Sequence, residues 1–190
     1  MNEEMCRKVV EALSRRGFAA TYCATKEEAA AAVLAETAGA GRIGMGGSET
    51  IKQLGVAAKL KDEGRLLTRG ADCDVFLLSA NALTLDGRIV NIDGNGNRVA
   101  ASVSGPGKVV YAIGRNKIVD GGIDAAIARI KEKACPPNCV RLGKRTPCAA
   151  TGKCADCDSP DRICKVTAVF DRRPTGTPTS VYVVNADLGY

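Results

Sequence analysis

Residues 74–91, DVFLLSANALTLDGRIVN, decide the fold. Residues 74–78 form an apolar run bounded by polar residues, which is typical of a parallel strand buried on both faces. The Asp86-Gly87 pair that follows is a strong hairpin signal, because it separates two short apolar segments. The stretch therefore predicts a buried parallel strand from which an antiparallel arm extends.

Strand and helix patterns alternate on both sides of this stretch. Strands are expected at residues 18–23, 42–45 and 108–113, and helices at residues 3–16, 25–38, 48–54 and 123–130. This alternation predicts an α/β fold with a doubly wound, mostly parallel sheet in a single domain, residues 1–190. Residues 135–165 interrupt the pattern and predict an inserted cysteine-rich lobe. We expect the last strands, at residues 166–170 and 180–184, to rejoin the main sheet.

The composition excludes several classes of function. Of the 190 residues, 45% are apolar and 25% are charged, as in globular rather than disordered proteins. The chain contains no His and no Trp, which excludes imidazole general bases, Cys/His pairs and Cys₂His₂ metal sites. The net charge is only +6, and side chains that stack on bases are scarce, so we expect no nucleic-acid partner.

The sequence also indicates a compartment. The N-terminal stretch has Glu3 and Glu4 before its apolar positions and lacks the apolar segment of a signal peptide. No run approaches the roughly 18 apolar residues of a membrane span. We therefore expect a cytoplasmic protein. In that reducing compartment, its nine cysteines are more often metal ligands or redox groups than disulfides.

Polar and glycine residues follow the expected strands at their carboxyl ends, where ligands bind in open α/β sheets. The Gly46-Gly47-Ser48 turn allows backbone N–H groups to approach an anion, although a tight turn with a Ser cap has the same pattern. Lys117 favours the anion. We expect a small organic anion or a phosphorylated substrate. Further candidate ligand-binding residues lie around the hairpin, namely Asn81, Asn91, Asp93, Asn97 and Arg98.

Three long motifs carry a resemblance to a known family. They are residues 74–101 (DVFLLSANALTLDGRIVNIDGNGNRVAA), 114–121 (GRNKIVDG) and 146–164 (TPCAATGKCADCDSPDRIC). The chain resembles the LUD (lactate utilization) domain, the family of lactate utilization protein C, and in particular its cysteine-bearing branch. The resemblance implies a fold of the ribose-5-phosphate isomerase and CoA-transferase type. It also implies a cytosolic role in the oxidation of lactate or a related 2-hydroxy acid.

More distant likenesses suggest catalytic residues. Residues 43–48 are similar to the phosphate-binding turn of ribose-5-phosphate isomerases, and residues 79–91 to the catalytic segment of methylthioribose-1-phosphate isomerases. The latter have an Asp where this chain has Asn81, and an amide cannot shuttle protons at neutral pH. Glu49 and Asp93 are the nearest substitute bases, and Glu49 is also the candidate nucleophile for a CoA-transferase-like mechanism. The position of Glu49 equally suits a surface charge at a helix start.

The four cysteines of the last motif have the spacing of a metal site. Cys148, Cys154, Cys157 and Cys164 follow the pattern C-x₅-C-x₂-C-x₆-C in a segment without an apolar core, which needs a covalent or metal staple to become ordered. Four thiolates suit zinc or an iron–sulfur cluster. Because a single Cys-x-x-Cys lies between two lone cysteines, the spacing favours a [4Fe–4S] cluster over zinc.

The residues around this motif are consistent with thiolate binding. Six Lys or Arg and one Glu give residues 129–145 a net charge of +5, which would lower thiol pKa values. Cys135 and Cys139 are left unassigned, as extra ligands, a redox pair or plain thiols. Three other cysteines lie in core-like segments and are expected to be small buried hydrophobes, namely Cys6, Cys23 and Cys73.

Three functions remain open at this point. The first is an iron–sulfur protein in anaerobic 2-hydroxy-acid oxidation, either as an oxidoreductase or as a subunit that exchanges electrons with partner proteins. The second is a sugar-phosphate or acyl-CoA enzyme whose lobe is held by structural zinc. The third is a non-catalytic sensor or scaffold. A second copy of the chain, forming a homodimer, is a further candidate partner.

Overall fold

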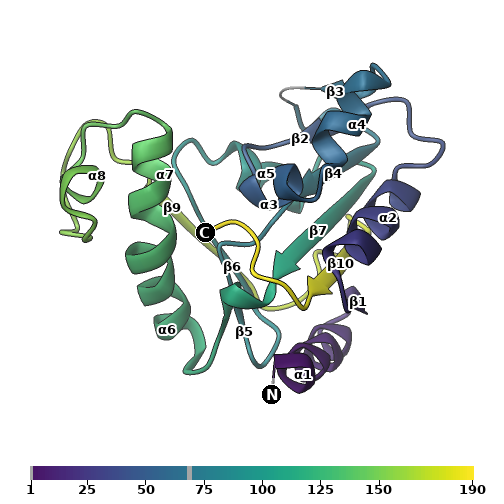
Figure 1. The fold of residues 1–190 in the computed structure, drawn as a ribbon, viewed down its shortest axis with the longest axis horizontal. Helices are drawn as coiled ribbons and strands as arrows, with labels where there is room; N and C mark the ends of the chain where they lie inside the picture. Colours follow the sequence, from purple (N-terminus) through teal and green to yellow (C-terminus); the bar gives the residue numbers. More distant parts are fainter. Residues whose placement is uncertain (1, 68–69) are drawn as a thin grey trace.

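The structure is a computed structural model that describes residues 2–67 and 70–190. In this part of the chain, six parallel strands form a central sheet in the order β1-β10-β7-β4-β2-β3 (Figure 1). The strands are β1 (Ala19–Cys23), β2 (Ile43–Met45), β3 (Leu66–Leu67), β4 (Val75–Leu78), β7 (Lys108–Gly114) and β10 (Thr179–Val184). The predicted run at residues 74–78 is indeed a central strand, and all four residues of β4 are buried.

Helices cover both faces of this sheet, because successive side chains of each strand point to opposite sides. Val109, Tyr111 and Ile113 of β7 pack with α1 (Asn2–Arg15) and α5 (Asn97–Val103). Val110 and Ala112 pack on the other side with α2 (Lys26–Glu36), α3 (Glu49–Gln53) and α4 (Val56–Asp62). The predicted doubly wound α/β fold is confirmed.

A second, four-stranded sheet follows from the hairpin. Its order is β8-β5-β6-β9, with β5 (Ala82–Thr84), β6 (Ile89–Asp93), β8 (Ile118–Val119) and β9 (Val166–Phe170). The Asp86-Gly87 turn joins β5 to the antiparallel β6, as predicted. Leu83, Ile89 and Phe170 pack toward the central sheet. The opposite face packs against α6 (Gly122–Arg129).

The prediction that both last strands rejoin the main sheet is wrong for one of them. β10 enters the central sheet between β1 and β7, but β9 pairs antiparallel with β6 in the second sheet. The alternation in residues 166–170 predicts a strand and does not identify its neighbour. The pairing with β6 involves all five residues of β9, and the N–H of the preceding Lys165 extends it by donating to the carbonyl of Asp93 at the end of β6.

The start of the cysteine-rich lobe also differs from the expectation. A turn of π-helix, η2 (Ile130–Ala134), connects α6 directly to α7 (Cys135–Arg141), and Figure 1 shows the three as one long helix. Pro136 and Pro137 follow this π-helical turn directly, and because proline has no backbone N–H, neither donates a hydrogen bond to a carbonyl of the preceding turn. The irregular part therefore begins after Arg141 and contains only the short α8 (Pro147–Thr151). We call residues 142–165 the cysteine lobe.

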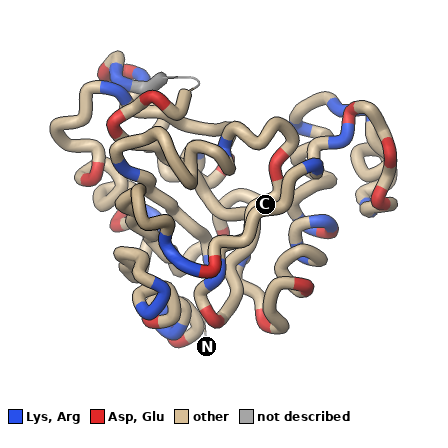
Figure 2. Tube along the Cα trace, turned by 180° about the vertical axis from the view of Figure 1, so that it is seen from behind, with Lys and Arg blue, Asp and Glu red and all other residues tan. Residues whose placement is uncertain are grey.

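Charged residues are spread over the whole molecule. Figure 2 shows Lys and Arg interspersed with Asp and Glu on both the main body and the cysteine lobe. Within residues 2–67 and 70–190, no helix has the length and apolar character needed to cross a membrane.

Candidate functional site at the carboxyl edge of the central sheet

The loops that follow β2, β4 and β7 meet at a small cavity, as the sheet topology predicts. Its volume is about 30 Å³, enough for one water-sized group rather than a whole substrate. Residues from these loops, from α7 and from the last residues of the chain line it, namely Gly47, Ser48, Glu49, Thr50, Ser79, Ala80, Asn81, Lys117, Asn138, Gly189 and Tyr190. We call this the edge cavity.

Lys117 provides the buried cation of the edge cavity. It follows β7 in the 3₁₀ turn η1 (Arg115–Lys117), and only 4% of it is exposed. Its Nζ donates hydrogen bonds to Thr50 Oγ1 at 2.7 Å and to Ser79 Oγ at 2.9 Å. Burial and, to a smaller extent, the nearby charges of Arg129 and Arg98 together lower the pKa of Lys117 to about 7. The amine is therefore close to half protonated at neutral pH.

The glycine turn before α3 mainly shapes the cavity wall. Ser48 is buried, and its Oγ accepts the backbone N–H of Ile51, so this hydroxyl acts as the helix cap. Gly46 lies against Arg98, since a Cβ on Gly46 would be 3.1 Å from the Arg98 Cδ. Gly47 is exposed at the cavity mouth. An anion-binding role of this turn stays a prediction.

Glu49 contributes a carboxylate to the same cavity. Its Oε1 is 2.9 Å from Lys52 Nζ and 3.5 Å from Arg141 Nε, and about a fifth (21%) of its side chain is exposed. Arg141 comes from the end of α7, so the long helix reaches the cavity from the side. The Glu49 carboxylate is thus paired with two cations, and its role as a base or nucleophile stays a prediction.

Two of the asparagines predicted as ligand-binding residues, Asn81 and Asn91, bind backbone N–H groups of β6 and of the connection between β4 and β5. The backbone N–H of Asn81 donates to Asn91 Oδ1 at 3.0 Å, and that of Ile92 donates to Asn81 Oδ1 at 2.9 Å. Arg98 Nη2 also donates to Asn81 Oδ1 at 3.0 Å. Asn91 is 1% exposed, and of these residues only Asn81 lines the edge cavity.

Asp93 and Asn97 lie outside the edge cavity as well. Asp93 Oδ2 accepts the backbone N–H groups of Arg98 and Val99, and thereby holds the start of α5. Asn97, the first residue of α5, is exposed. The catalytic role of Asp93 and the ligand-binding role of Asn97 therefore stay predictions without a place in this cavity.

Several residues of the site were not among those predicted from the sequence. Thr50 and Ser79 accept the two hydrogen bonds of Lys117, and Asn138 reaches the cavity from α7. Asn138 could have been placed near the cavity only if the α6 helix had been predicted to continue through residues 135–139. Gly189 and Tyr190 follow the last strand without any periodic pattern, and the N–H of Gly189 donates to Gln53 Oε1 at 2.7 Å.

Thiols of the cysteine lobe approach those of α7. The Sγ atoms of Cys139 and Cys148 are 3.6 Å apart, and both residues are buried. Burial, together with the nearby thiols of Cys164, Cys139, Cys148 and Cys154, raises the pKa of Cys135 to about 12. Five cysteines thus lie around the junction of α7 with the lobe.

The four cysteines singled out from the sequence do not form a closed set. In the described ranges 2–67 and 70–190, no three Cys, Asp or Glu side chains are placed to share a metal ion. Cys157 is half-buried, and its carbonyl accepts a hydrogen bond from Arg162 Nη1 at 2.7 Å. The metal-binding role of Cys148, Cys154, Cys157 and Cys164 stays a prediction.

Comparison with known proteins decides the family. The sequence pattern of the LUD domain matches residues 6–184, which is nearly the whole chain. The chain belongs to the LUD-domain family. This family is associated with lactate utilization.

The LUD fold is supported independently by a solved structure. A DUF162 family protein from Deinococcus radiodurans is similar over 97% of this chain and 98% of its own, with a TM-score of 0.58. Only 15% of the aligned residues are identical, so the likeness shows the fold alone. No curated protein matches the sequence significantly.

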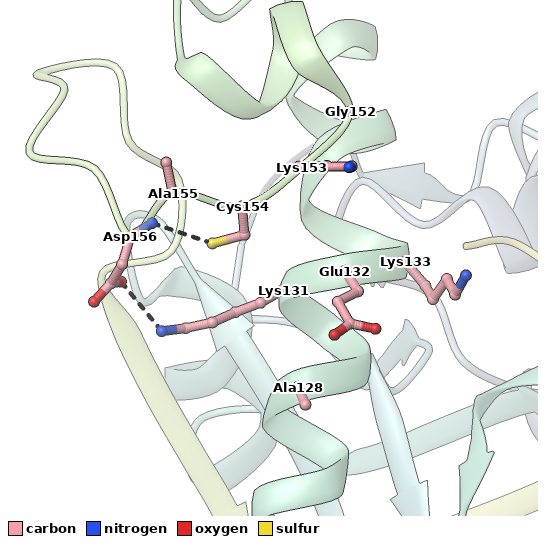
Figure 3. Close-up of a pocket in the computed structure, with 9 residues that line it drawn as sticks. All are labelled: Ala128, Lys131, Glu132, Lys133, Gly152, Lys153, Cys154, Ala155 and Asp156. Carbon is pink, nitrogen blue, oxygen red and sulfur yellow. Dashed lines mark hydrogen bonds and ion pairs between the residues drawn. The ribbon is translucent and has the colours of Figure 1, made fainter.

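This LUD domain has a second, larger hollow beside its cysteine lobe. A groove of about 720 Å³ separates the α6–η2 helix from residues 152–156 (Figure 3). Lys131 Nζ is 3.1 Å from Asp156 Oδ1, and the N–H of Asp156 donates to Cys154 Sγ at 3.4 Å. Part of the positive charge expected around the thiols is thus paired with acidic side chains of the lobe.

Proposed function

We propose that this LUD-domain protein binds a small organic anion at the edge cavity and takes part in the oxidation of lactate or a related 2-hydroxy acid, with an iron–sulfur cluster in the cysteine lobe. The observation that carries the proposal is the buried Lys117, which has hydroxyl partners instead of a carboxylate partner in the described part of the chain. A buried amine without a counter-ion favours an anionic ligand, because the anion stabilises its protonated form.

The surroundings of Lys117 support a carboxylate ligand. Arg98 and Arg129 add positive charge nearby, as the lowered pKa of Lys117 reflects. Thr50 and Ser79 line the same cavity and accept hydrogen bonds from Nζ, which the amine can exchange for bonds to a ligand oxygen. Among the described residues that line the cavity, Glu49 has the only carboxylate side chain, and its pairing with Lys52 and Arg141 reduces its repulsion of an anion.

The cysteine lobe supplies suitable donors for an iron–sulfur cluster. Cys148, Cys154 and Cys164 lie close enough to Cys135 to oppose its ionisation, and thiolates are the usual ligands of such clusters. A bound cluster would supply one-electron transfer. Oxidation of a 2-hydroxy acid to a 2-oxo acid releases two electrons and two protons, so an electron-transfer protein is the partner that we expect.

Metal analysis and ligand binding test the two halves of this proposal separately. Protein purified without oxygen should contain about four irons per chain and absorb broadly near about 400 nm. L-Lactate should raise the midpoint of thermal unfolding of the wild-type protein and of Lys108→Met, whose lysine pairs with Glu36, but not that of Lys117→Met. A colourless, iron-free preparation would refute the cluster, and equal indifference of all three proteins to lactate would refute the anion site.

One observation favours zinc as a second candidate. Two thiolates bound to one tetrahedral zinc ion lie about 3.8 Å apart. The 3.6 Å between Cys139 Sγ and Cys148 Sγ is close to that separation. On this alternative the lobe is structural, and the anion site belongs to a sugar-phosphate or acyl-CoA enzyme. About one zinc per chain, together with thermal stabilisation by ribose 5-phosphate and not by lactate, would support it.

A further inference from the structure

We propose that Lys117 is a nucleophile that forms a covalent imine with the carbonyl carbon of a 2-oxo acid. The proposal rests on the proposed function, because a 2-oxo acid is the oxidation product of a 2-hydroxy acid. Lys117 would then react covalently with the ligand, in addition to attracting its negative charge.

The placement of the Lys117 amine is the first support. Only 4% of Lys117 is exposed, and the residue lines the edge cavity. Its partners Thr50 Oγ1 and Ser79 Oγ accept hydrogen bonds and do not hold the amine as an ammonium ion in the way that a carboxylate does. Lys108 shows the contrast, because its Nζ forms a salt bridge with Glu36.

The protonation state of the amine is the second support. An imine forms only from a neutral amine, since the nitrogen lone pair attacks the carbonyl carbon. Burial lowers the pKa of Lys117 to about 7, and Arg129 and Arg98 act in the same direction. A large fraction of Lys117 is therefore neutral at the pH of the cell, whereas an exposed lysine is almost fully protonated.

The size of the cavity restricts the ligand. About 30 Å³ accepts one small group, such as a carbonyl, so the rest of the ligand lies outside this space, toward the mouth. The carboxylate of a 2-oxo acid would then point toward the mouth at Gly47. A Cβ on Gly47 would lie 3.8 Å from Arg141 Nη2, so a guanidinium is close to that mouth. Arginine is well suited to a carboxylate, because it can donate two parallel hydrogen bonds.

The reaction is balanced without an oxidant or a reductant. The lone pair of Nζ forms the C–N bond, and the carbonyl π electrons move to oxygen, which takes up a proton from solvent to give a carbinolamine. The nitrogen loses one proton to Glu49, which lines the same cavity. The hydroxyl group then takes up a proton and leaves as water, and the nitrogen lone pair forms the C=N bond of a protonated imine. Glu49 is suited to return the proton that this last step consumes.

Reductive trapping tests the proposal on the wild-type protein. The full chain is incubated with pyruvate, reduced with borohydride, digested and mapped by mass spectrometry. We expect one reduced pyruvate adduct per chain on the peptide that contains Lys117, and none with lactate, which has no carbonyl group. Lys108→Met should keep the adduct and Lys117→Met should lose it, and the peptide map decides the question even if Lys117→Met does not fold.

The other outcomes separate this inference from the proposed function. Adducts spread evenly over exposed lysines such as Lys59 and Lys61 would overturn it. So would the absence of an adduct in protein that pyruvate or lactate stabilises against heat, although anion binding would then stand. If neither acid stabilises the protein and no adduct forms, both the imine and the anion site are refuted.

Discussion

The central sheet and the cysteine lobe are ordered by different forces. In β4 every residue is buried, and in β7 all but Lys108 are buried. In the lobe, residues 142–165, only Thr146 and Cys148 are buried. Apolar burial at about 25 cal/mol per Å² can therefore stabilise the sheet but contributes little to the lobe. The chain therefore contains one region whose structure is specified by an apolar core and another whose structure depends on polar contacts and thiols.

The polar contacts of the lobe are individually weak. Arg162 donates to the carbonyls of Cys157 and Cys164 at 2.7 and 2.8 Å, which fixes the loop between these cysteines. The ion pairs of Asp156 involve a carboxylate that is 65% exposed, and such pairs contribute between about 0 and 1 kcal/mol. These contacts define a shape without giving it much stability, so a bound metal would add the missing free energy.

The largest loss of stability is expected for a substitution at Gly87, where the hairpin packs against α1 and leaves no room for a side chain. Gly87 has a φ of +86°, and a Cβ there would lie 2.6 Å from the backbone carbon of Ala12 in α1. Gly87→Ala should lower the free energy of unfolding by roughly 3 kcal/mol, from the backbone strain and the steric clash together. Gly39→Ala is the matched control, because φ is +76° and a Cβ would meet nothing within 4 Å. It should cost only about 1 kcal/mol. Urea unfolding measures both, and equal losses would contradict the packing of the hairpin against α1.

The second largest effect is a loss of metal and of local stability that should be confined to the cysteine lobe. Cys148→Ser removes a predicted metal ligand, whereas Cys73→Ser changes a cysteine that is 4% exposed within the apolar core. Cys148→Ser should lose most of the bound metal and become cleavable by trypsin at Lys153 at least about tenfold faster, which corresponds to about 1.4 kcal/mol for opening of the lobe. Cys73→Ser should keep its metal and lose global stability. Full metal content in Cys148→Ser would show that the lobe does not depend on this thiol.

The same contrast explains how far the sequence predicts the structure. Periodic apolar runs specify β4, β7 and the helices around them, because burial on a given face dictates the spacing of apolar residues. Asp86 and Gly87 specify the hairpin for a local steric reason. The partner of β9 and the length of α7 depend on contacts between distant segments, such as the one from Lys165 to Asp93, and no local pattern encodes them.

The location of the candidate site could be predicted from the order of strands and helices, but the roles of several of its residues could not. The carboxyl ends of parallel strands bring Ser48, Asn81 and Lys117 to one cavity. The roles of Asn91 and Asp93 were not predictable, since a polar side chain that binds backbone N–H groups has the same sequence signature as one that binds a ligand. The place of Asn138 at the cavity was not predictable either, because it depends on the continuation of the α6 helix through Pro136 and Pro137.

The third effect is a pH dependence that belongs to the edge cavity. Because folding lowers the pKa of Lys117 from 10.5 to about 7, the unfolded chain binds more protons between these values, and this group makes stability rise with pH across that window. Relative to Lys117→Met, the wild-type protein should gain about 1 kcal/mol between pH 7 and pH 8. The guanidinium groups of Arg98 and Arg129 lie near the amine and favour its neutral form. Lys108→Met should show the wild-type slope in urea titrations, and parallel slopes for all three proteins would disprove the lowered pKa.

The smallest effect on global stability is expected for a substitution of Asp156, whose ion pairs hold the cysteine lobe in shape. Asp156 pairs with Lys131 and Arg162 at 3.1 and 2.8 Å, and these contacts hold the pKa of its carboxyl below the ordinary value. Asp156→Asn removes the charge and keeps the volume, so global unfolding in urea should change by less than about 0.5 kcal/mol. If the lobe opens independently of the sheet, tryptic cleavage at Lys153 should nevertheless become faster, because its opening depends on few other contacts. A loss of global stability equal to the loss in the lobe would mean that the two regions unfold together, and the contrast between them would not hold.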